Sequence, residues 1–231
     1  MEEGAVTLEE RDEAFADEWA RRTAGADAVV FDFGGVISVA PDTEDWPVYD
    51  YCASRGVDRK AFDAGWRSYR HLYDGGFIGF EEMYRRTFAD AGAEPPTRED
   101  FDALVRLDLE GWIRTLRTDT LALMRRIKSE GRKVGILTNM SPDFYEKLFV
   151  TRAAAYRALA DAEVVSGLEH IYKPQPEIYS LMASRLGLPP DRLFFLDDLE
   201  RNVEGARACG WQASVYPVCA VPSAQCPVPV V

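Results

Sequence analysis

The sequence lacks several features that mark particular classes of protein. Its apolar runs fall well short of the roughly 20 residues needed to span a bilayer, so no transmembrane helix is expected. Its four cysteines stand singly with no C-x-x-C pair, which argues against both a disulfide framework and a zinc site. The first residues, Met1-Glu-Glu-Gly, are acidic and carry no apolar signal segment, which favours a cytoplasmic protein.

Positive charge is also scarce. Lys and Arg number 27 against 39 Asp and Glu, for a formal net charge of −12 at pH 7. We therefore expect neither a nucleic-acid partner nor a membrane surface as partner. An acidic protein that handles an anionic small molecule needs local positive charge, which a bound cation would supply. The sequence is compatible with a monomer or a homodimer.

Residues 1–26 are predicted to form a helical arm. The segment Thr7-Leu8-Glu9-Glu10 matches a capping box that starts a helix at Leu8. Leu8, Phe15 and Trp19 then fall on one helical face, which predicts that the arm packs against the body of the protein.

Strand-like and helix-like segments alternate through 27–42 and 117–216. This alternation predicts an α/β fold with a doubly wound, parallel, Rossmann-like sheet. The expected strands are 28–33, 133–138, 163–165, 193–196 and 211–216, and the expected helices include 142–159, 176–186 and 200–209.

Two regions differ from this pattern. Residues 43–116 are aromatic, charged and helix-periodic, with breaks at Gly56, Gly75-Gly76 and Pro95-Pro96, and they predict a separate unit of about four helices. Residues 217–231 contain repeated prolines and are predicted to be a disordered tail.

Polar residues follow the predicted strands at their carboxyl ends: Asp32, Thr138 and the pair Asp197-Asp198. In open α/β sheets, ligands bind in the crevice outside those ends. Taken alone, Asp32 also suits a turn, and the acid pair also suits a helix start. Together, carboxylates that converge from two strands repel one another unless a hard cation such as Mg²⁺ lies between them.

Two further segments suit the binding of a phosphate group. Thr138-Asn139 stands just before Ser141-Pro142, which looks like a helix start, where a hydroxyl and backbone N–H groups bind anions. Lys173 precedes Pro174, which restricts it to a rigid connector, although a lysine alone is most often a surface charge.

In this order, the segments resemble the motifs of the haloacid dehalogenase-like (HAD) hydrolase superfamily. Within it, the chain is most similar to sugar-phosphate phosphatases and to the N-terminal phosphatase domain of soluble epoxide hydrolases. The matching segments are Val30-Phe-Asp-Phe-Gly-Gly-Val36, Ile136-Leu-Thr-Asn139, Tyr172-Lys-Pro-Gln-Pro-Glu-Ile-Tyr179 and Phe195-Leu-Asp-Asp-Leu-Glu-Arg-Asn202.

The resemblance implies a HAD core with an inserted helical cap over 43–116, and a Mg²⁺-dependent phosphatase acting on a small phosphorylated metabolite. Asp32 would be the nucleophile that forms an aspartyl-phosphate, and Lys173 would neutralise charge beside it. Thr138 and the Asn139 amide would bind phosphoryl oxygens. Asp32, the Gly34 carbonyl and Asp198 would hold Mg²⁺, with Asp197 and Asn202 supporting them.

Gly34 departs from the family pattern, because phosphatases of this family usually carry an acid there. General acid–base help is worth about 10²–10⁴-fold. Three explanations stay open: a substrate with a good leaving group, a cap residue or water in place of the acid, or phosphatase activity that is slow or absent. Two other functions also stay open. One is a 2-haloacid dehalogenase, although those enzymes replace the acid pair by neutral residues. The other is a domain that only binds a phosphorylated ligand or a protein.

Overall fold

The computed structural model describes residues 7–39 and 46–217. Its centre is a five-stranded sheet in the order β3-β2-β1-β4-β5, and every neighbouring pair is parallel. This confirms the predicted fold class. The strands are β1 (Ala28–Phe31), β2 (Lys133–Thr138), β3 (Ala162–Val165), β4 (Leu193–Asp197) and β5 (Gln212–Val215). The predicted disordered tail lies outside the described residues from position 218 onward.

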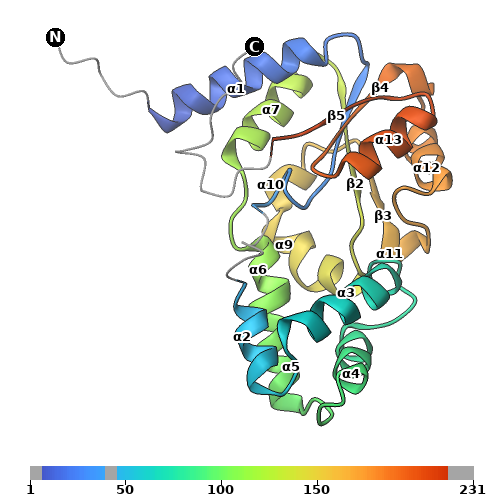
Figure 1. Ribbon diagram of the computed structural model, residues 1–231. Helices are drawn as coiled ribbons and strands as arrows, with labels where there is room; N and C mark the ends of the chain where they lie inside the picture. Colours follow the sequence, from blue (N-terminus) through green and yellow to red (C-terminus); the bar gives the residue numbers. More distant parts are fainter. Residues whose placement is uncertain (1–6, 40–45, 218–231) are drawn as a thin grey trace.

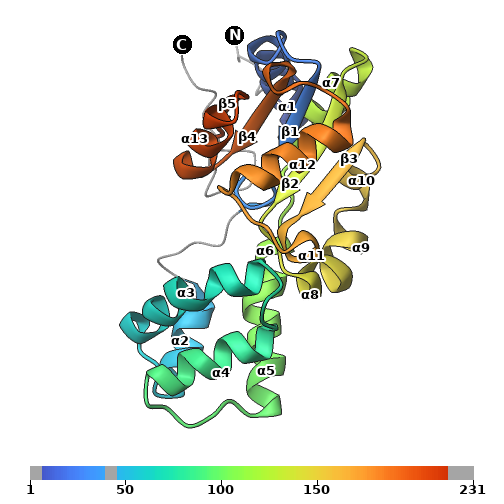
Figure 2. The same cartoon turned by 90° about the vertical axis from the view of Figure 1, so that its right-hand side faces the viewer.

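Helices cover both faces of the sheet (Figures 1 and 2). The side chains of β1 alternate between the faces, as the geometry of a strand requires. Val29 and Phe31 join the core cluster that includes α1 (Leu8–Arg22) and α7 (Thr118–Ser129), whereas Ala28 and Val30 pack with α12 (Pro176–Leu186) and α13 (Glu200–Ala208). Because both faces are buried, β1 is a continuous apolar run.

The helical arm begins where the sequence predicts. Thr7 and Glu10 form both hydrogen bonds of the capping box, and α1 packs along α7 (Figure 1). Phe15 and Trp19 are buried, with ring centroids 5.7 and 5.1 Å from that of Tyr216. The expectation for Leu8 is wrong: it is 47% exposed, because the first turn of α1 extends beyond the surface that covers Phe15 and Trp19.

The helical region forms a second body below the sheet in both ribbon views. The predicted breaks at Gly56, Gly75-Gly76 and Pro95-Pro96 all fall between its helices. An isolated antiparallel bridge between Ser38 and Leu116 joins the segments where the chain leaves and re-enters the sheet domain. The elements are α2 (Pro47–Ser54), α3 (Arg59–Asp74), α4 (Phe80–Asp90), α5 (Arg98–Leu104), a π-helical turn (Val105–Leu109) and α6 (Glu110–Ile113).

The segment 142–159 is not the single helix that the sequence predicts. It divides into α8 (Pro142–Phe144), a π-helical turn (Tyr145–Phe149), α9 (Val150–Arg152) and α10 (Ala154–Arg157). Ala153 interrupts the run, with backbone angles of φ −95° and ψ 19°. The short helix α11 (Ser166–Glu169) was not predicted, because four residues are too few to show helical periodicity. A single 3₁₀ turn, Pro190–Arg192, precedes β4.

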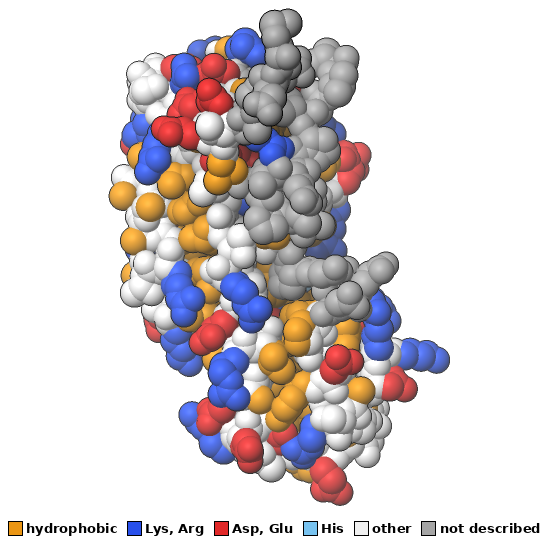
Figure 3. Space-filling model, turned by 90° about the vertical axis from the view of Figure 1, so that its left-hand side faces the viewer, with side chains coloured by type: hydrophobic (Ala, Val, Ile, Leu, Met, Phe, Trp, Pro, Cys, Tyr) orange, Lys and Arg blue, Asp and Glu red, His pale blue; other side chains and the backbone are white. Residues whose placement is uncertain are grey.

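Hydropathy and charge both vary along the part of the chain that the structure describes. No helix among residues 7–39 and 46–217 is long and apolar enough to cross a bilayer. Figure 3 shows acidic and basic side chains interspersed over one face of the described residues, without an extended basic area.

Two glycines provide a matched test of how the helical region meets the sheet domain. Gly76, in the turn after α3, has φ +72°, and a Cβ there would lie 2.3 Å from the backbone oxygen of Gly167. Gly92 has φ +68° and nothing within 4 Å of such a Cβ. We expect Gly92→Ala to cost about 1–2 kcal/mol for the left-handed backbone. Gly76→Ala adds a backbone clash and should cost about 2–5 kcal/mol.

Urea unfolding of both variants measures this difference. Equal losses of unfolding free energy would show that the turn after α3 does not press on α11 in solution.

Candidate active site

The carboxyl ends of the adjacent strands β1 and β4 bring the predicted acids together. Phe31 at the end of β1 pairs with Ile136 of β2 and with Leu196 of β4, so the residues that follow emerge at one edge of the sheet. The Asp32 backbone N–H donates to the Leu196 carbonyl at 2.9 Å. One carboxylate oxygen from each of Asp32, Asp197 and Asp198 lies within 4.8 Å of the other two. The structure therefore places these acids side by side.

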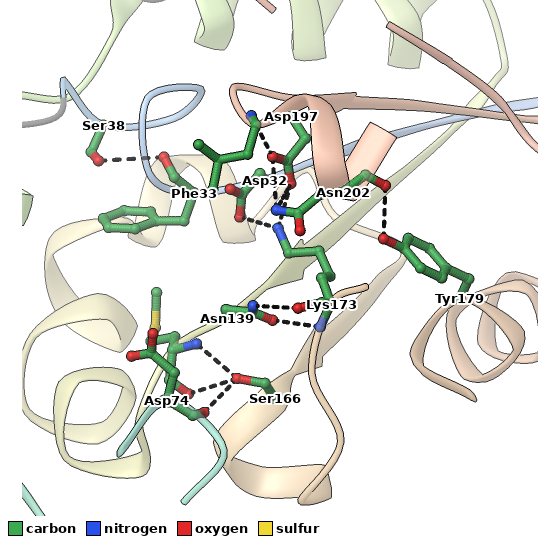
Figure 4. A network of polar contacts seen from close by, with 12 residues as sticks. Asp32, Phe33, Ser38, Asp74, Asn139, Ser166, Lys173, Tyr179, Asp197 and Asn202 are labelled. Carbon is green, nitrogen blue, oxygen red and sulfur yellow. Dashed lines mark hydrogen bonds and ion pairs between the residues drawn. The ribbon is translucent and has the colours of Figure 1, made fainter. Parts of the chain in front are cut away.

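Lys173 lies between two of these carboxylates (Figure 4). Its Nζ is 2.8 Å from Asp32 Oδ1 and 2.6 Å from Asp197 Oδ2. The side chain is almost completely buried, so water screens these ion pairs only weakly. Lys173 is therefore no surface charge, and the site contains a fixed cation beside Asp32.

Asn139 holds the backbone of Lys173 in place. Its Nδ2 donates to the Lys173 carbonyl at 3.0 Å, and its Oδ1 accepts from the Lys173 N–H at 2.8 Å. Both polar groups of the Asn139 side chain are thus engaged within the chain, as Figure 4 shows. The side chain positions Lys173, which leaves the backbone amide as the group of Asn139 that could contact a phosphoryl oxygen.

Asp197 differs from the other two acids because its hydrogen-bonding capacity is used. Besides Lys173, it accepts from the Leu199 N–H at 2.9 Å and from Asn202 Nδ2 at 3.0 and 3.1 Å. Asn202 is itself held by Tyr179, whose hydroxyl donates to the Asn202 carbonyl at 2.8 Å. Asp197 and Asn202 therefore orient the site, whereas Asp32 and Asp198 have oxygens to offer to a ligand.

Gly35 allows Asp198 to approach the loop after β1. A Cβ at this position would lie 2.7 Å from Asp198 Oδ2, and the backbone has φ +73°, where a side chain is strained.

Thr138 lies at the end of β2, and Ser141 lies at the start of α8. Both are buried, and Ser141 accepts the Phe144 N–H as the predicted N-cap.

The electrostatics of the three acids fit a bound cation. Burial raises the pKa of Asp32 above its usual range, although the ion pair with Lys173 opposes this. Burial also raises the pKa of Asp198, to about 6, and the neighbouring Asp197 adds to that effect. Burial acts to lower the pKa of Lys173, but its pairing with Asp197 and Asp32 raises it overall. One lysine does not balance three clustered acids, and oxygen ligands of this kind suit Mg²⁺.

A cavity of about 330 Å³ opens over this edge of the sheet. The sheet domain supplies Asp32, Gly34, Thr138, Lys173 and Asp198 to its lining, and the helical region supplies Trp66, Arg70, Tyr73, Asp74 and Trp112. Trp112 packs on Gly34: a Cβ on Gly34 would lie 3.2 Å from the indole ring. The space where the family usually carries an acid is therefore taken by an aromatic side chain.

The sequence identified some of these lining residues only as members of a larger group. Trp66, Arg70 and Tyr73 fall in the aromatic, charged segment 43–116, for which the sequence predicts only a separate helical unit. Trp46 and Tyr49 from the same segment pack within the helical region, with ring centroids 5.7 Å apart. Asp74, Trp112 and Arg201 were missed. Asp74 stands four residues after Arg70, a spacing that could have indicated the pair, but nothing local marks Trp112.

Relatives of this chain include both phosphatases and dehalogenases. A segment of 196 residues is 31% identical to acyl-CoA dehydrogenase family member 10 of Mus musculus, covering 79% of this chain and 17% of that protein. A segment of 112 residues is 33% identical to phosphatase MT3486 of Mycobacterium tuberculosis, covering 48% of this chain and 51% of that protein. A segment of 103 residues is 31% identical to an (S)-2-haloacid dehalogenase of Pseudomonas putida, covering 44% of this chain and 42% of that protein. The chain thus spans about a sixth to a half of these relatives.

Solved structures share the fold at low sequence identity. A HAD family enzyme from Bacteroides thetaiotaomicron, in complex with magnesium and inorganic phosphate, matches with a TM-score of 0.64 and 19% identity, over 84% of this chain and 96% of that one. The L-2-haloacid dehalogenase of Xanthobacter autotrophicus matches with a TM-score of 0.57 and 20% identity, over 81% of this chain and 76% of that one. The family model for haloacid dehalogenase-like hydrolases matches residues 26–210. With the acids and lysine of its motifs assembled at one sheet edge, the chain belongs to the haloacid dehalogenase-like hydrolase family.

Proposed function

We propose that this hydrolase is a Mg²⁺-dependent phosphatase that cleaves a small phosphorylated metabolite through an aspartyl-phosphate at Asp32. The observation that carries the proposal is the arrangement of Asp32, Asp197 and Asp198 within 4.8 Å around a single buried lysine. Buried acids at this spacing are costly without a further cation, whereas phosphoryl transfer depends on positive charge and alignment.

Each residue of the site has a defined part in this proposal. Asp32 attacks phosphorus and displaces the alcohol of the substrate, and water then hydrolyses the aspartyl-phosphate to release inorganic phosphate. Lys173 balances negative charge between the nucleophile and the phosphoryl group. Thr138 and the backbone amide of Asn139 contact the phosphoryl oxygens. Asp32, the Gly34 carbonyl and Asp198 would hold Mg²⁺, which, when bound, neutralises charge on the transferred group. The helical region over 43–116 acts as the cap on a core formed by 27–42 and 117–216, and excludes water from the cavity.

The relatives support this assignment in part. A curated phosphatase shares 33% identity over 112 residues, and a structural neighbour was solved with magnesium and phosphate. The dehalogenase relatives keep the rival function open. Against it stands the pair Asp197-Asp198, because an attack on carbon requires no metal. Lys173 pairs with Asp32 and Asp197, so without a metal Asp198 would add negative charge beside the nucleophile with no counter-charge of its own among the described residues.

The metal dependence of phosphate release tests the proposal. With para-nitrophenyl phosphate, we expect EDTA to lower the rate about 100-fold or more, because transition-state charge would lose its main counter-charge. Added Mg²⁺ should restore the rate, and Asp198→Asn should raise the Mg²⁺ concentration needed for half-maximal activity.

Two results would contradict the phosphatase assignment. Halide release from 2-chloropropionate that persists in EDTA would favour the dehalogenase. Mg²⁺-dependent binding of phosphorylated metabolites in calorimetry, without turnover of any of them, would favour a domain that only binds.

A further inference from the structure

The helical region supplies one arginine to the cavity, and its donors are only partly used. Arg70 on α3 lines the cavity and is 22% exposed. Its Nε donates to both oxygens of Asp74, each at 2.8 Å. Its Nη1 is buried and has no hydrogen-bond partner. Asp74 therefore accepts from Nε, which leaves Nη1 unused among the described residues.

Aromatic rings hold the Arg70 guanidinium in one orientation. Its Cζ lies 4.2 Å from the centroid of the Trp66 ring, 5.6 Å from that of Tyr73 and 5.8 Å from that of Trp112. Cation–π contacts of this kind stabilise a charged side chain that has lost part of its hydration. The same three aromatic side chains line the cavity, so the arginine and an apolar wall face the same space.

Arg70 lies among other buried polar groups that lack a hydrogen bond. The Tyr73 hydroxyl, Trp112 Nε1 and Asp108 Oδ1 are also buried without a partner among the described residues. Asp74 is the residue that hydrogen-bonds to Arg70 among the described residues, and Asp108 is a second acid whose charge acts on it. Buried donors are rarely left unpaired, so Nη1 of Arg70 calls for a further acceptor, which is either Asp108 or a group from outside the chain.

We propose that Arg70 binds a second oxyanion of the substrate, a carboxylate or a phosphate group that does not react, while the body of the substrate lies against Trp66 and Trp112. The inference rests on the proposed function, which places the reacting phosphoryl group at Asp32. A guanidinium presents parallel N–H donors that match the two oxygens of such a group. Arg70 and Lys173 both line the cavity, so the two cations border the same space.

Matched aryl phosphates test this substrate class. The neutral 4-carbamoylphenyl phosphate is compared with 4-carboxyphenyl phosphate, and 1,4-phenylene bisphosphate tests a phosphate in place of the carboxylate. We expect kcat/KM for at least one of the two anionic esters to exceed that for the neutral ester by about tenfold or more, the value of one charged hydrogen bond. In Arg70→Gln/Asp74→Asn, which removes both members of the ion pair, this ratio should fall to about one. In Arg67→Gln, an exposed arginine on the same helix, it should not change.

A binding measurement separates this inference from the proposed function. Quenching of tryptophan fluorescence by 4-hydroxybenzoate, with 4-hydroxybenzamide as neutral control, requires no turnover, and of the five tryptophans Trp66 and Trp112 line the cavity. We expect saturable quenching that the Arg70→Gln/Asp74→Asn variant loses. Saturable quenching in a chain that releases no phosphate would refute the phosphatase alone. Phosphate release without preference for either anionic ester, or equal losses on all esters in the variant, would show that Arg70 only balances Asp74 and Asp108, and would overturn the inference.

Discussion

Replacing Asp32 by asparagine is expected to lower kcat/KM for an aryl phosphate by about 10⁴-fold or more, because the amide cannot form the covalent intermediate. The chain should stay folded, since Lys173 retains its ion pair with Asp197 at 2.6 Å. Phosphate release measures the activity, and thermal unfolding measures the stability. Asp32→Ala should show the same loss of activity, which excludes an effect particular to the amide.

A surface aspartate provides the matched control. Asp27 stands just before the same strand, and among the described residues its side chain pairs with the exposed Arg192, at 2.6 Å. Surface ion pairs of this kind contribute about 0–1 kcal/mol, so Asp27→Asn should leave kcat/KM within about twofold. If Asp32→Asn keeps more than a tenth of the wild-type activity, Asp32 is not the nucleophile, whatever the control shows.

The second large effect is expected from the leaving group of the substrate. Gly34 cannot protonate a departing alcohol, and Trp112 fills the space above it, 3.2 Å from where a Cβ would lie. Without a general acid, the rate should fall steeply as the pKa of the leaving alcohol rises. We therefore expect aryl and acyl phosphates to be cleaved about 10²–10⁴-fold faster than alkyl phosphates, the range that such an acid usually supplies.

Introducing an acid at position 34 tests whether the missing general acid causes the dependence on the leaving group. Gly34→Asp alone should be poorly accommodated, because its side chain meets the indole ring of Trp112. In Gly34→Asp/Trp112→Gly the ring is gone, and we expect faster cleavage of alkyl phosphates and a flatter dependence on leaving-group pKa. Trp112→Gly alone is the control for loss of the aromatic wall. A flat dependence in the wild-type protein would contradict this account, and Asp74, the acid that the helical region adds to the cavity lining, would then be the residue to replace.

The sheet and its acids could be predicted because each signal is local. Buried parallel strands are continuous apolar segments, and the residue after each strand emerges at the same edge, so Asp32, Thr138 and Asp197 could be placed together without knowing any long-range contact. The predicted 133–138 strand and 176–186 helix coincide with β2 and α12. The capping box at Thr7 was predictable for the same reason, since both of its hydrogen bonds span three residues.

The surroundings of that edge depended on contacts between residues far apart in the sequence. The Asn139 side chain hydrogen-bonds to the backbone of Lys173, which is 34 positions away in the sequence. Trp112 reaches Gly34 only because the helical region packs over the sheet, and no periodicity within either segment encodes that approach. The amino-acid sequence by itself therefore determined the fold class and the acids of the site. Tertiary packing alone decided which side chains close the cavity and left Nη1 of Arg70 without a hydrogen-bond partner among the described residues, because side-chain burial depends on how separate elements meet.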